Sequence, residues 1–489
     1  MYEVALTFSV LTFIIVLVFF AQSKLLSAFH PITYYLLFHG FIFVFRPIVA
    51  YFRDYDMIYR IFRFQPSISD KITVICASNI GFLVFVYACW RAGNTPMKFK
   101  IDSLADTERK RLSPLFIWVI AICVPIGAYS LALTWDAAVT TGSAYSGMVI
   151  DATSGHSINT ENTGYVVEAQ LMLATCGALI AWLLRFRLLA VMPLVLFVAF
   201  RAGIGGRGPF VAALGSVGLL YLYEHRLRFP NFRVLVALPI IVMFFNTVGD
   251  DRGASIRRLV ADDVSSSTFG ANRDRERFLE GMDFANMEYF EYLVYVIPQR
   301  SGTYGYFNDV LQVFTEPVPR AIWPDKPAGA PFSRIKFFEY GNPITMSFSL
   351  PGEGWYSLGW IGVIIWSGVC GWALGWIYRR FVNGAQSAFQ TATYMVFIPT
   401  LTLAFRDGQL VTVFRQSLFF FMPIFLWWRI ARLIGVPTLA KARMINARRE
   451  RDMKDGKLPR SLQPNDHNLP AAVARRRLAL AKVKLEQQD

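Results

Sequence analysis

Residues 1–22 have the sequence MYEVALTFSVLTFIIVLVFFAQ, and this stretch decides the fold class. Its residues are mostly large and apolar, and Glu3 is its only charged residue. A helix of about 20 such residues spans a hydrocarbon core about 30 Å thick. The stretch lacks a basic leading region and a small-residue cleavage site, so we interpret it as a retained membrane span rather than a signal peptide.

Similar apolar blocks recur along the whole chain. Of the 489 residues, 54% are hydrophobic and 17% are charged, against about 25% charged in soluble domains. The sequence therefore predicts an all-α polytopic membrane protein with about eleven transmembrane helices (10–12) and one long external loop. The predicted spans are 2–22, 32–52, 72–90, 114–135, 166–184, 188–204, 208–224, 233–249, 355–378, 391–405 and 410–431.

The basic residues of the loops predict the orientation. The connection 91–113 contains six Lys or Arg residues, whereas 136–165 contains none, so we place the former in the cytoplasm. Alternation then places residues 250–354 outside. Residues 53–71 disagree, because they should lie outside yet carry three Arg and one Lys. An amphipathic segment in the membrane interface would explain this, and so would a misplaced early span.

This topology divides the chain into four parts. We expect an N-terminal transmembrane bundle of about eight spans at 1–249 and a long periplasmic, partly helical loop at 250–354. Three further spans follow at 355–431, and a basic cytoplasmic tail at 432–489. Within the loop, the sequence predicts a helix over Arg275 to Val296 and a proline-rich, aromatic remainder.

Charge and cysteines exclude several classes of protein. The net charge of +15 is concentrated near the C-terminus, where residues 429–489 hold fifteen Lys or Arg against six acids. A basic tail beside anionic lipid headgroups explains this surplus, so we expect no nucleic-acid partner, although Arg475, Arg476 and Arg477 leave RNA or protein binding open. All five cysteines lie in apolar blocks without CxxC spacing, which argues against disulfides and a cysteine metal site.

Arginines at external membrane boundaries are the first candidates for a site. Arg207 lies in the GGRGP turn at 205–209, Arg406 in FRDG at 405–408, and Arg415 inside the last span. A guanidinium near hydrocarbon is costly and usually faces a polar interior. Its bidentate fork suits phosphate oxygens, so we interpret the cluster as a pyrophosphate receptor. The bland alternatives are salt-bridged surface arginines and a simple tight turn at GGRGP.

Two motifs of the long loop add candidates. PRAIWPDKP at 319–327 presents Arg320, Asp325 and Lys326 around Trp323, an arrangement suited to a glycan and phosphate site or to a Trp-anchored loop at the membrane. GEGWYSLGW at 352–360 then enters a span with Glu353 at the boundary. Glu353 is either a base or a first-turn acid that the helix dipole favours.

The order of these motifs resembles the Wzy-type polymerases of bacterial oligosaccharide repeat units, relatives of the O-antigen ligases. GGRGP, IPQRSGTYGYFNDVLQ at 297–312, PRAIWPDKP, GEGWYSLGWIG and FRDG carry the resemblance, which covers about residues 165–430. The first 110 residues and the tail show no signature. The loop histidine of the ligases has no counterpart, since residues 250–354 contain no His, which favours a polymerase.

The resemblance implies a metal-independent glycosyltransferase of the lipid-donor, GT-C-like type in the bacterial inner membrane, without cofactor. Its donor would be a glycan on undecaprenyl pyrophosphate, and its acceptor the non-reducing end of a new lipid-linked repeat unit. A polysaccharide chain-length regulator is a possible partner. Catalytic candidates are Arg207, Arg320, Glu353 and Asp325, and substrate-binding candidates are Arg300, Lys326, Arg406, Arg415 and Trp323.

Two other classes stay open. An O-antigen ligase would transfer finished glycan to a lipid A core. A non-enzymatic transporter of lipid-linked oligosaccharide should carry inverted repeats and polar residues through the midplane of several spans, and the sequence shows neither clearly.

Overall fold

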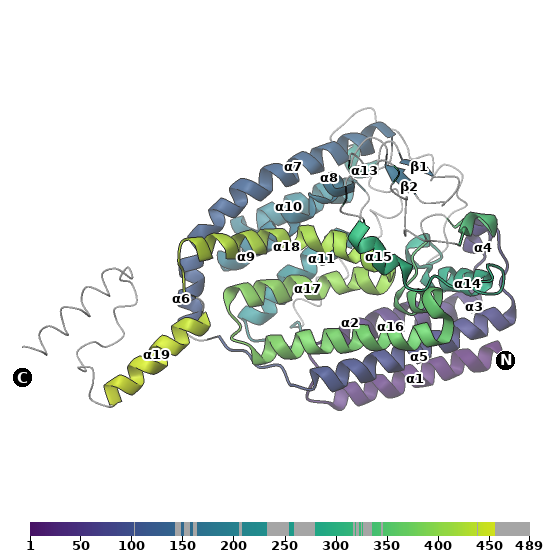
Figure 1. Ribbon diagram of the computed structural model, residues 1–489, viewed down its shortest axis with the longest axis horizontal. Helices are drawn as coiled ribbons and strands as arrows, with labels where there is room; N and C mark the ends of the chain where they lie inside the picture. Colours follow the sequence, from purple (N-terminus) through teal and green to yellow (C-terminus); the bar gives the residue numbers. More distant parts are fainter. Residues whose placement is uncertain are drawn as a thin grey trace, which may run out of the picture.

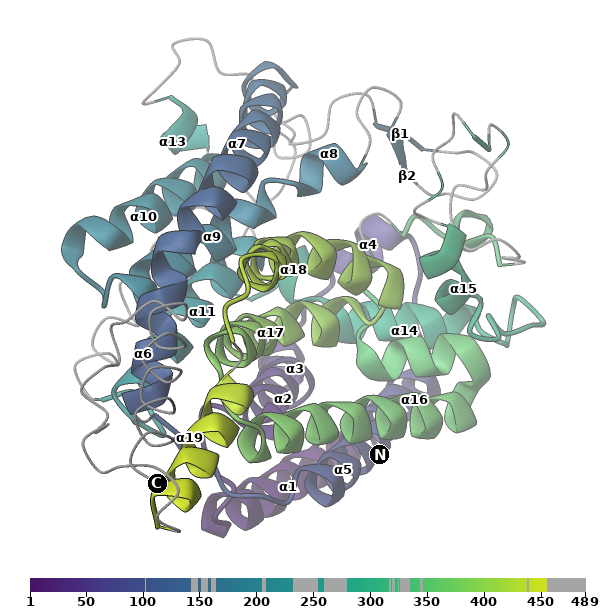
Figure 2. The same cartoon turned by 60° about the vertical axis from the view of Figure 1, so that its left-hand side comes forward.

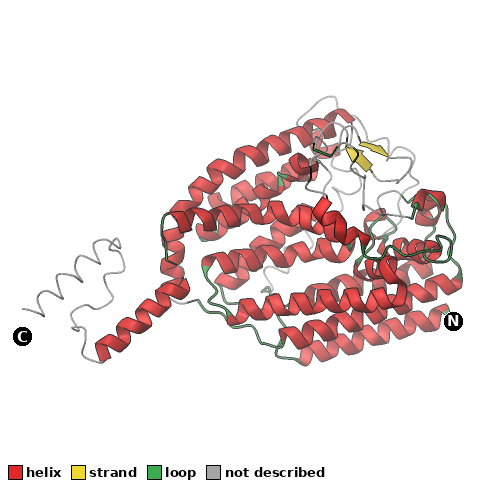
Figure 3. Ribbon diagram, in the orientation of Figure 1, coloured by secondary structure: helices red, strands yellow, loops and turns green. Residues whose placement is uncertain are grey.

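The structure is a computed structural model in which most of the chain is helical (Figure 3). It describes residues 1–101, 103–141, 148–150, 157–159, 164–204, 208–231, 254–258, 279–315, 318, 322–323, 325, 335–343, 346–437 and 439–454. Two short strands, β1 (Met148–Ile150) and β2 (Ser157–Asn159), pair antiparallel, with Val149 opposite Ile158.

Among the described residues, eight helices are long and apolar enough to cross a membrane, which confirms a polytopic helical membrane protein. They run over Tyr2–Gln22, Pro31–Arg53, Ile68–Gly93, Ser103–Thr140, Val166–Leu183, Leu350–Asn383, Ala388–Asp407 and Leu410–Leu433. Two more predicted spans are the shorter helices α10 (Leu188–Gly203) and α11 (Gly208–Glu224). The predicted span 233–249 lies outside the described residues.

The remaining elements divide these spans or connect them. The first three spans and the turn between the second and third comprise α1 (Tyr2–Gln22), α2 (Pro31–His39), the π-helical η1 (Gly40–Phe45), α3 (Arg46–Arg53), α4 (Met57–Phe62) and α5 (Ile68–Gly93). The middle of the chain forms α6 (Ser103–Leu112), η2 (Ser113–Leu115), α7 (Phe116–Thr141), α8 (Gly164–Glu168) and α9 (Leu171–Leu183). The long loop contributes α13 (Ala254–Arg257), η3 (Met282–Phe284), α14 (Asn286–Val296), α15 (Asn308–Thr315) and η4 (Phe337–Glu339). The last elements are α16 (Leu350–Asn383), α17 (Ala388–Asp407), α18 (Leu410–Leu433) and α19 (Leu439–Lys454).

The helices lie in layers across the bundle. Helices α1, α5 and α16 run side by side along one flank, whereas α7, α9 and α10 form the opposite flank (Figures 1 and 2). Helices α17 and α18 lie between them, where α17 packs on α11 and α18 packs on α9. The short helices α4, α14 and α15 gather at one end of the bundle, and α6 and α19 lie at the other (Figure 1).

Close packing of α5 on α16 fixes the first flank. A Cβ added to Gly371 would clash with the Phe85 carbonyl oxygen, and one added to Gly375 would clash with that of Cys89. Small residues let two membrane helices approach until their backbones touch, and dispersion contacts then replace lipid contacts. The third and ninth predicted spans are therefore direct neighbours.

Helix α16 reverses its direction near its start. Leu358 (φ −153°, ψ 29°) and Gly359 (φ 57°, ψ −137°) depart from helical geometry, and Gly354 packs against Gly362 across the bend. Only glycine adopts the Gly359 conformation without strain. The predicted span 355–378 thus begins earlier, at Leu350, and its first two turns fold back on the rest of the helix.

One helix of the long loop, α14, lies inside the bundle. Every residue of α14 except Tyr295 is buried, and its Phe290 and Leu293 belong to a hydrophobic core with η1, α4 and α5. The helix predicted over Arg275–Val296 starts at Asn286, after a short 3₁₀ turn. Residues 259–278 lie outside the described part of the chain.

Residues 53–71 pack against this buried helix. The Phe62 ring of α4 stacks on Tyr289 of α14, with centroids 5.2 Å apart. The helices on both sides of the segment, Pro31–Arg53 and Ile68–Gly93, are long enough to span a membrane. The segment and α14 therefore lie at the same end of the bundle.

Candidate functional site

A seam of polar groups runs along the end of the bundle where α14 enters. The reversed start of α16, the end of α17, the beginning of α18 and the short helix α15 meet there (Figure 2). Two predicted site residues, Glu353 and Arg406, lie in this seam.

Glu353 is buried in the first turn of α16. Its side chain is 1% exposed, and its Oε2 atom has no hydrogen-bond partner among the described residues. The turn is built by Ser349, whose hydroxyl accepts a hydrogen bond from the Gly352 amide at 3.4 Å and whose carbonyl accepts one from Glu353 N at 3.0 Å. A carboxylate that merely complements a helix dipole lies in water, so burial favours the interpretation of Glu353 as a working group.

Asp309 of α15 is a second buried carboxylate that sequence reasoning missed. It is 7% exposed and close enough to act electrostatically on Glu353. Burial raises the pKa of Asp309 to about 6. Two like charges in a low-dielectric site resist simultaneous ionisation. The signal was present in FNDV at 307–310, within a motif that carries the family resemblance.

Arg406 holds three helices together at the seam. Its carbonyl oxygen accepts hydrogen bonds from Ser349 N at 3.0 Å and from Asn286 Nδ2 at 2.8 Å. These contacts connect the end of α17 with the starts of α16 and α14. The structure places Glu353 and the backbone of Arg406 at the same end of the bundle, whereas the convergence of their side chains on a site and their catalytic roles stay predictions.

Arg415 lies in a polar cluster around Glu168, on which the charges of Arg201 and Asp407 also act. Its Nη2 atom lies 3.6 Å from Oε1 of Glu168, a carboxylate that is 6% exposed. Nearby, Arg201 Nη1 donates to Gln170 Oε1 at 2.9 Å. Sequence reasoning missed Arg201, although it is the only charged residue of the predicted span 188–204.

Arg300 lies on the α5 side of α14. Its guanidinium stacks 3.4 Å above the Tyr295 ring, and Gln299 beside it donates to Asp70 Oδ1 at 2.9 Å. Among the described residues, Arg300 makes no contact with Glu353.

The PRAIWPDKP motif is described only in part. Trp323 is 37% exposed and Asp325 is exposed, and neither contacts Glu353 among the described residues. Arg207, Arg320 and Lys326 lie outside the described residues, so their predicted roles stay predictions. In the part of the chain that is described, no three His, Cys, Asp or Glu side chains gather as a metal-ligand set.

Fold and site together define a multi-span membrane protein with buried ionisable groups at one end of its helix bundle. Such groups are expensive near hydrocarbon and mark function. The chain belongs to the O-antigen polysaccharide polymerase Wzy family, whose family model matches residues 1–432. No curated protein and no solved structure matches the chain.

Family membership confirms the resemblance and extends it to the first 110 residues, where sequence reasoning found no signature. The chain is thus a multi-pass inner-membrane glycosyltransferase-type polymerase of polysaccharide biosynthesis, and it acts on lipid-linked oligosaccharide repeat units.

Proposed function

We propose that the chain transfers a growing glycan from undecaprenyl pyrophosphate to the non-reducing end of a new lipid-linked repeat unit at the periplasmic face, without a metal. The observation that carries this proposal is the buried carboxylate pair of Glu353 and Asp309, in the seam that Arg406 helps to build. Removal of a hydroxyl proton in a dry site needs such a group.

The proposed step is a single displacement. The acceptor hydroxyl oxygen attacks the anomeric carbon of the donor, and the bond from that carbon to the pyrophosphate oxygen breaks. The hydroxyl proton passes to the carboxylate pair, and the lipid pyrophosphate leaves with the electron pair. Preorganised cations stabilise the charge that develops on it. We assign this role to Arg406 and, outside the described residues, to Arg207, Arg320 and Lys326, with Arg415 and Arg300 further away.

Helix α15 offers a path for the lipid. Leu311 and Phe314 on α15 are 46% and 74% exposed, while Asp309 on the same helix is buried. An apolar outer face beside a buried carboxylate suits a substrate whose polyprenyl chain lies in the membrane while its headgroup reaches the seam. In this proposal Trp323 and Asp325 bind the glycan.

The proposed topology follows the sequence prediction. Eleven spans and a GT-C-like architecture place residues 250–354 in the periplasm, between the bundles 1–249 and 355–431, and the tail 432–489 in the cytoplasm. A chain-length regulator would contact the periplasmic side, where the polymer emerges.

Reconstitution tests this function. Purified protein in liposomes receives a synthetic lipid-linked repeat unit, with EDTA present and nucleotide sugars absent, and gel electrophoresis resolves the products. A ladder of lengthening chains supports the proposal. Transfer of finished glycan to added lipid A core, or movement of intact substrate across the bilayer without chain growth, would instead establish the ligase or the transporter.

A further inference from the structure

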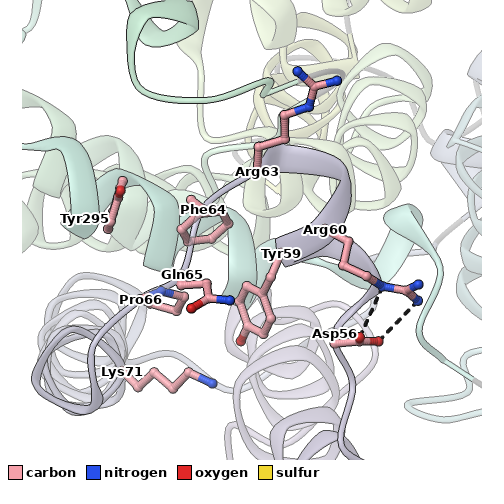
Figure 4. Close-up of a pocket in the computed structure, with 9 residues that line it drawn as sticks. All are labelled: Asp56, Tyr59, Arg60, Arg63, Phe64, Gln65, Pro66, Lys71 and Tyr295. Carbon is pink, nitrogen blue, oxygen red and sulfur yellow. Dashed lines mark hydrogen bonds and ion pairs between the residues drawn. The ribbon is translucent and has the colours of Figure 1, made fainter.

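A pocket of about 620 Å³ lies beside α14, apart from the carboxylate pair (Figure 4). Its volume falls within the range of about 300–1,000 Å³ that is common for ligand sites. It is built from α4, the turn after it, the first turn of α5 and the end of α14. The lining residues are Asp56, Tyr59, Arg60, Arg63, Phe64, Gln65, Pro66, Lys71 and Tyr295.

The pocket carries a surplus of positive charge. Asp56 is its only acid and is paired with Arg60, with Nε 3.1 Å from Oδ2 and Nη2 3.3 Å from Oδ1. Among the described residues, no hydrogen bond or ion pair engages the Arg63 guanidinium. Lys71 Nζ lies 4.7 Å from the centre of the Tyr59 ring. Arg63 is therefore available to a ligand, whereas the charge of Lys71 also acts on the buried Glu291.

Two acids lie behind the pocket. Glu291 accepts a hydrogen bond from the Tyr59 hydroxyl at 2.6 Å, and burial raises its pKa to about 7, with Lys71 acting in the opposite direction. Asp70 accepts hydrogen bonds from Ser67 N and Gln299 Nε2, and the Arg300 charge lies close to it.

The walls are aromatic. The Tyr59 and Phe64 rings meet edge to face at 5.4 Å, and Phe64 lies 5.5 Å from Tyr295. Aromatic faces pack against the C–H faces of sugar rings while their polar edges remain hydrated. Figure 4 shows Arg60, Arg63 and Lys71 pointing in different directions, with Arg63 directed away from Tyr59 and Lys71, so only an extended ligand with several anionic groups could reach more than one of them.

The position of the cations supports a role in binding. Residues 53–71 lie at the end of the bundle where α14 enters, opposite to α6 and α19 (Figure 1). Orientation rules give no reason for Arg63 and Lys71 at this end. A ligand that binds Arg63 and Lys71 would give a reason for their position.

We propose that this pocket is a subsite for an acidic oligosaccharide, whose sugar rings pack beside Tyr59 and whose carboxylates are held by Arg63 and Lys71. This inference rests on the proposed function, because it names acidic glycans as the class of substrate. A second anion of the same system, the lipid pyrophosphate, lacks sugar rings to fill the aromatic wall.

Direct binding to the full-length protein in detergent tests the subsite. The probes are trigalacturonic acid, neutral maltotriose and inorganic pyrophosphate, measured by isothermal titration calorimetry. We expect trigalacturonic acid to bind, maltotriose to bind at least tenfold more weakly, and pyrophosphate to compete poorly. The double variant Arg63→Gln/Lys71→Gln should lose at least tenfold in affinity for trigalacturonic acid.

The matched control is Arg91→Gln/Lys98→Gln, which removes two exposed cations, the first of them at the opposite end of α5. It should bind as the wild type does, and equal melting temperatures of both variants verify the fold.

Equal binding of acidic and neutral probes, unchanged affinity in the pocket variant, or full competition by pyrophosphate overturns the subsite. Chain growth of an acidic lipid-linked repeat unit is measured separately: if it persists without trigalacturonic acid binding, only the subsite is wrong. Binding without chain growth contradicts the polymerase alone.

Discussion

At the scale of single residues, the proposed reaction depends on two buried carboxylates 44 positions apart in the sequence, Asp309 and Glu353, of which the first acts electrostatically on the second. Neither has an exposed side chain. Glu280, Glu288 and Glu291 of the long loop are buried as well, so burial alone does not distinguish Asp309 and Glu353; the electrostatic effect of Asp309 on Glu353 does.

The raised pKa of Asp309 predicts opposite pH dependences of activity and stability. A carboxyl that must accept a proton works only when ionised, so the rate of chain growth should rise with pH through about 6. The folded protein holds this proton more tightly than the unfolded chain does. The stability that the folded protein gains from protonated Asp309 is therefore complete below the ordinary pKa of 3.8 and is lost as the pH rises through about 6.

Rates and melting temperatures between pH 4.5 and 7.5 check this prediction. Asp309→Asn should be inactive throughout and should have a flatter melting curve against pH. A variant that keeps the wild-type rate profile would exclude Asp309 from the reaction.

At the scale of elements, the sequence predicted the membrane-spanning helices and the motifs well. It predicted the contacts between distant helices poorly. Apolar blocks gave the long helices because span length follows from bilayer thickness. The reversal of α16 was missed because GEGWYSLGW has the composition of a continuous helix entry. The burial of α14 was missed because its Glu288 pairs with Arg46, 242 positions away, and no local pattern reports such a pair.

The reversal of α16 should depend on Gly359. An alanine there strains the backbone by about 1–3 kcal/mol or straightens the bend, and either effect displaces Glu353. Gly359→Ala should therefore lower chain growth at least tenfold in the reconstituted assay, at equal protein amount. Gly218→Ala in α11 is the control, because a Cβ there meets nothing within 4 Å. Equal activity of both variants would show that the bend is dispensable.

The Arg46–Glu288 ion pair should hold α14 in the bundle. Arg46 is 1% exposed and also donates to the Leu279 carbonyl at 2.9 Å. Arg46→Met leaves a buried carboxylate uncompensated, at a cost of about 3–5 kcal/mol. The double variant Arg46→Met/Glu288→Leu removes both charges and should recover most of the lost melting temperature. If the double variant instead loses as much melting temperature as the two single variants together, a direct pair is contradicted.

At the scale of the whole molecule, the bundle has two unlike ends. Helices α6 and α19, with the basic connection 91–113, lie at one end, and the carboxylate pair and the acidic-glycan pocket lie at the other (Figure 1). Sequence reasoning reached this polarity from charged loops. It did not reach the pocket, since residues 56–66, 71 and 295 are brought together only by the fold.

The orientation of this bundle is testable in intact cells. In a variant without native cysteines, a cysteine at exposed Glu339 should react with a membrane-impermeant maleimide added from outside, once the outer membrane is permeabilised. A cysteine at exposed Met444 of α19 should react only after the inner membrane is lysed. The reverse pattern would invert the proposed topology.

The most direct test of the central claim is chain growth by Glu353→Gln in liposomes with a synthetic lipid-linked repeat unit. Glu339→Gln, in the same loop and exposed, is the control. The account predicts that Glu353→Gln reconstitutes in normal amount and loses about 10²–10⁴-fold in rate, while Glu339→Gln makes the wild-type ladder. Wild-type chain growth by Glu353→Gln would contradict the claim that the buried carboxylate pair takes the acceptor proton.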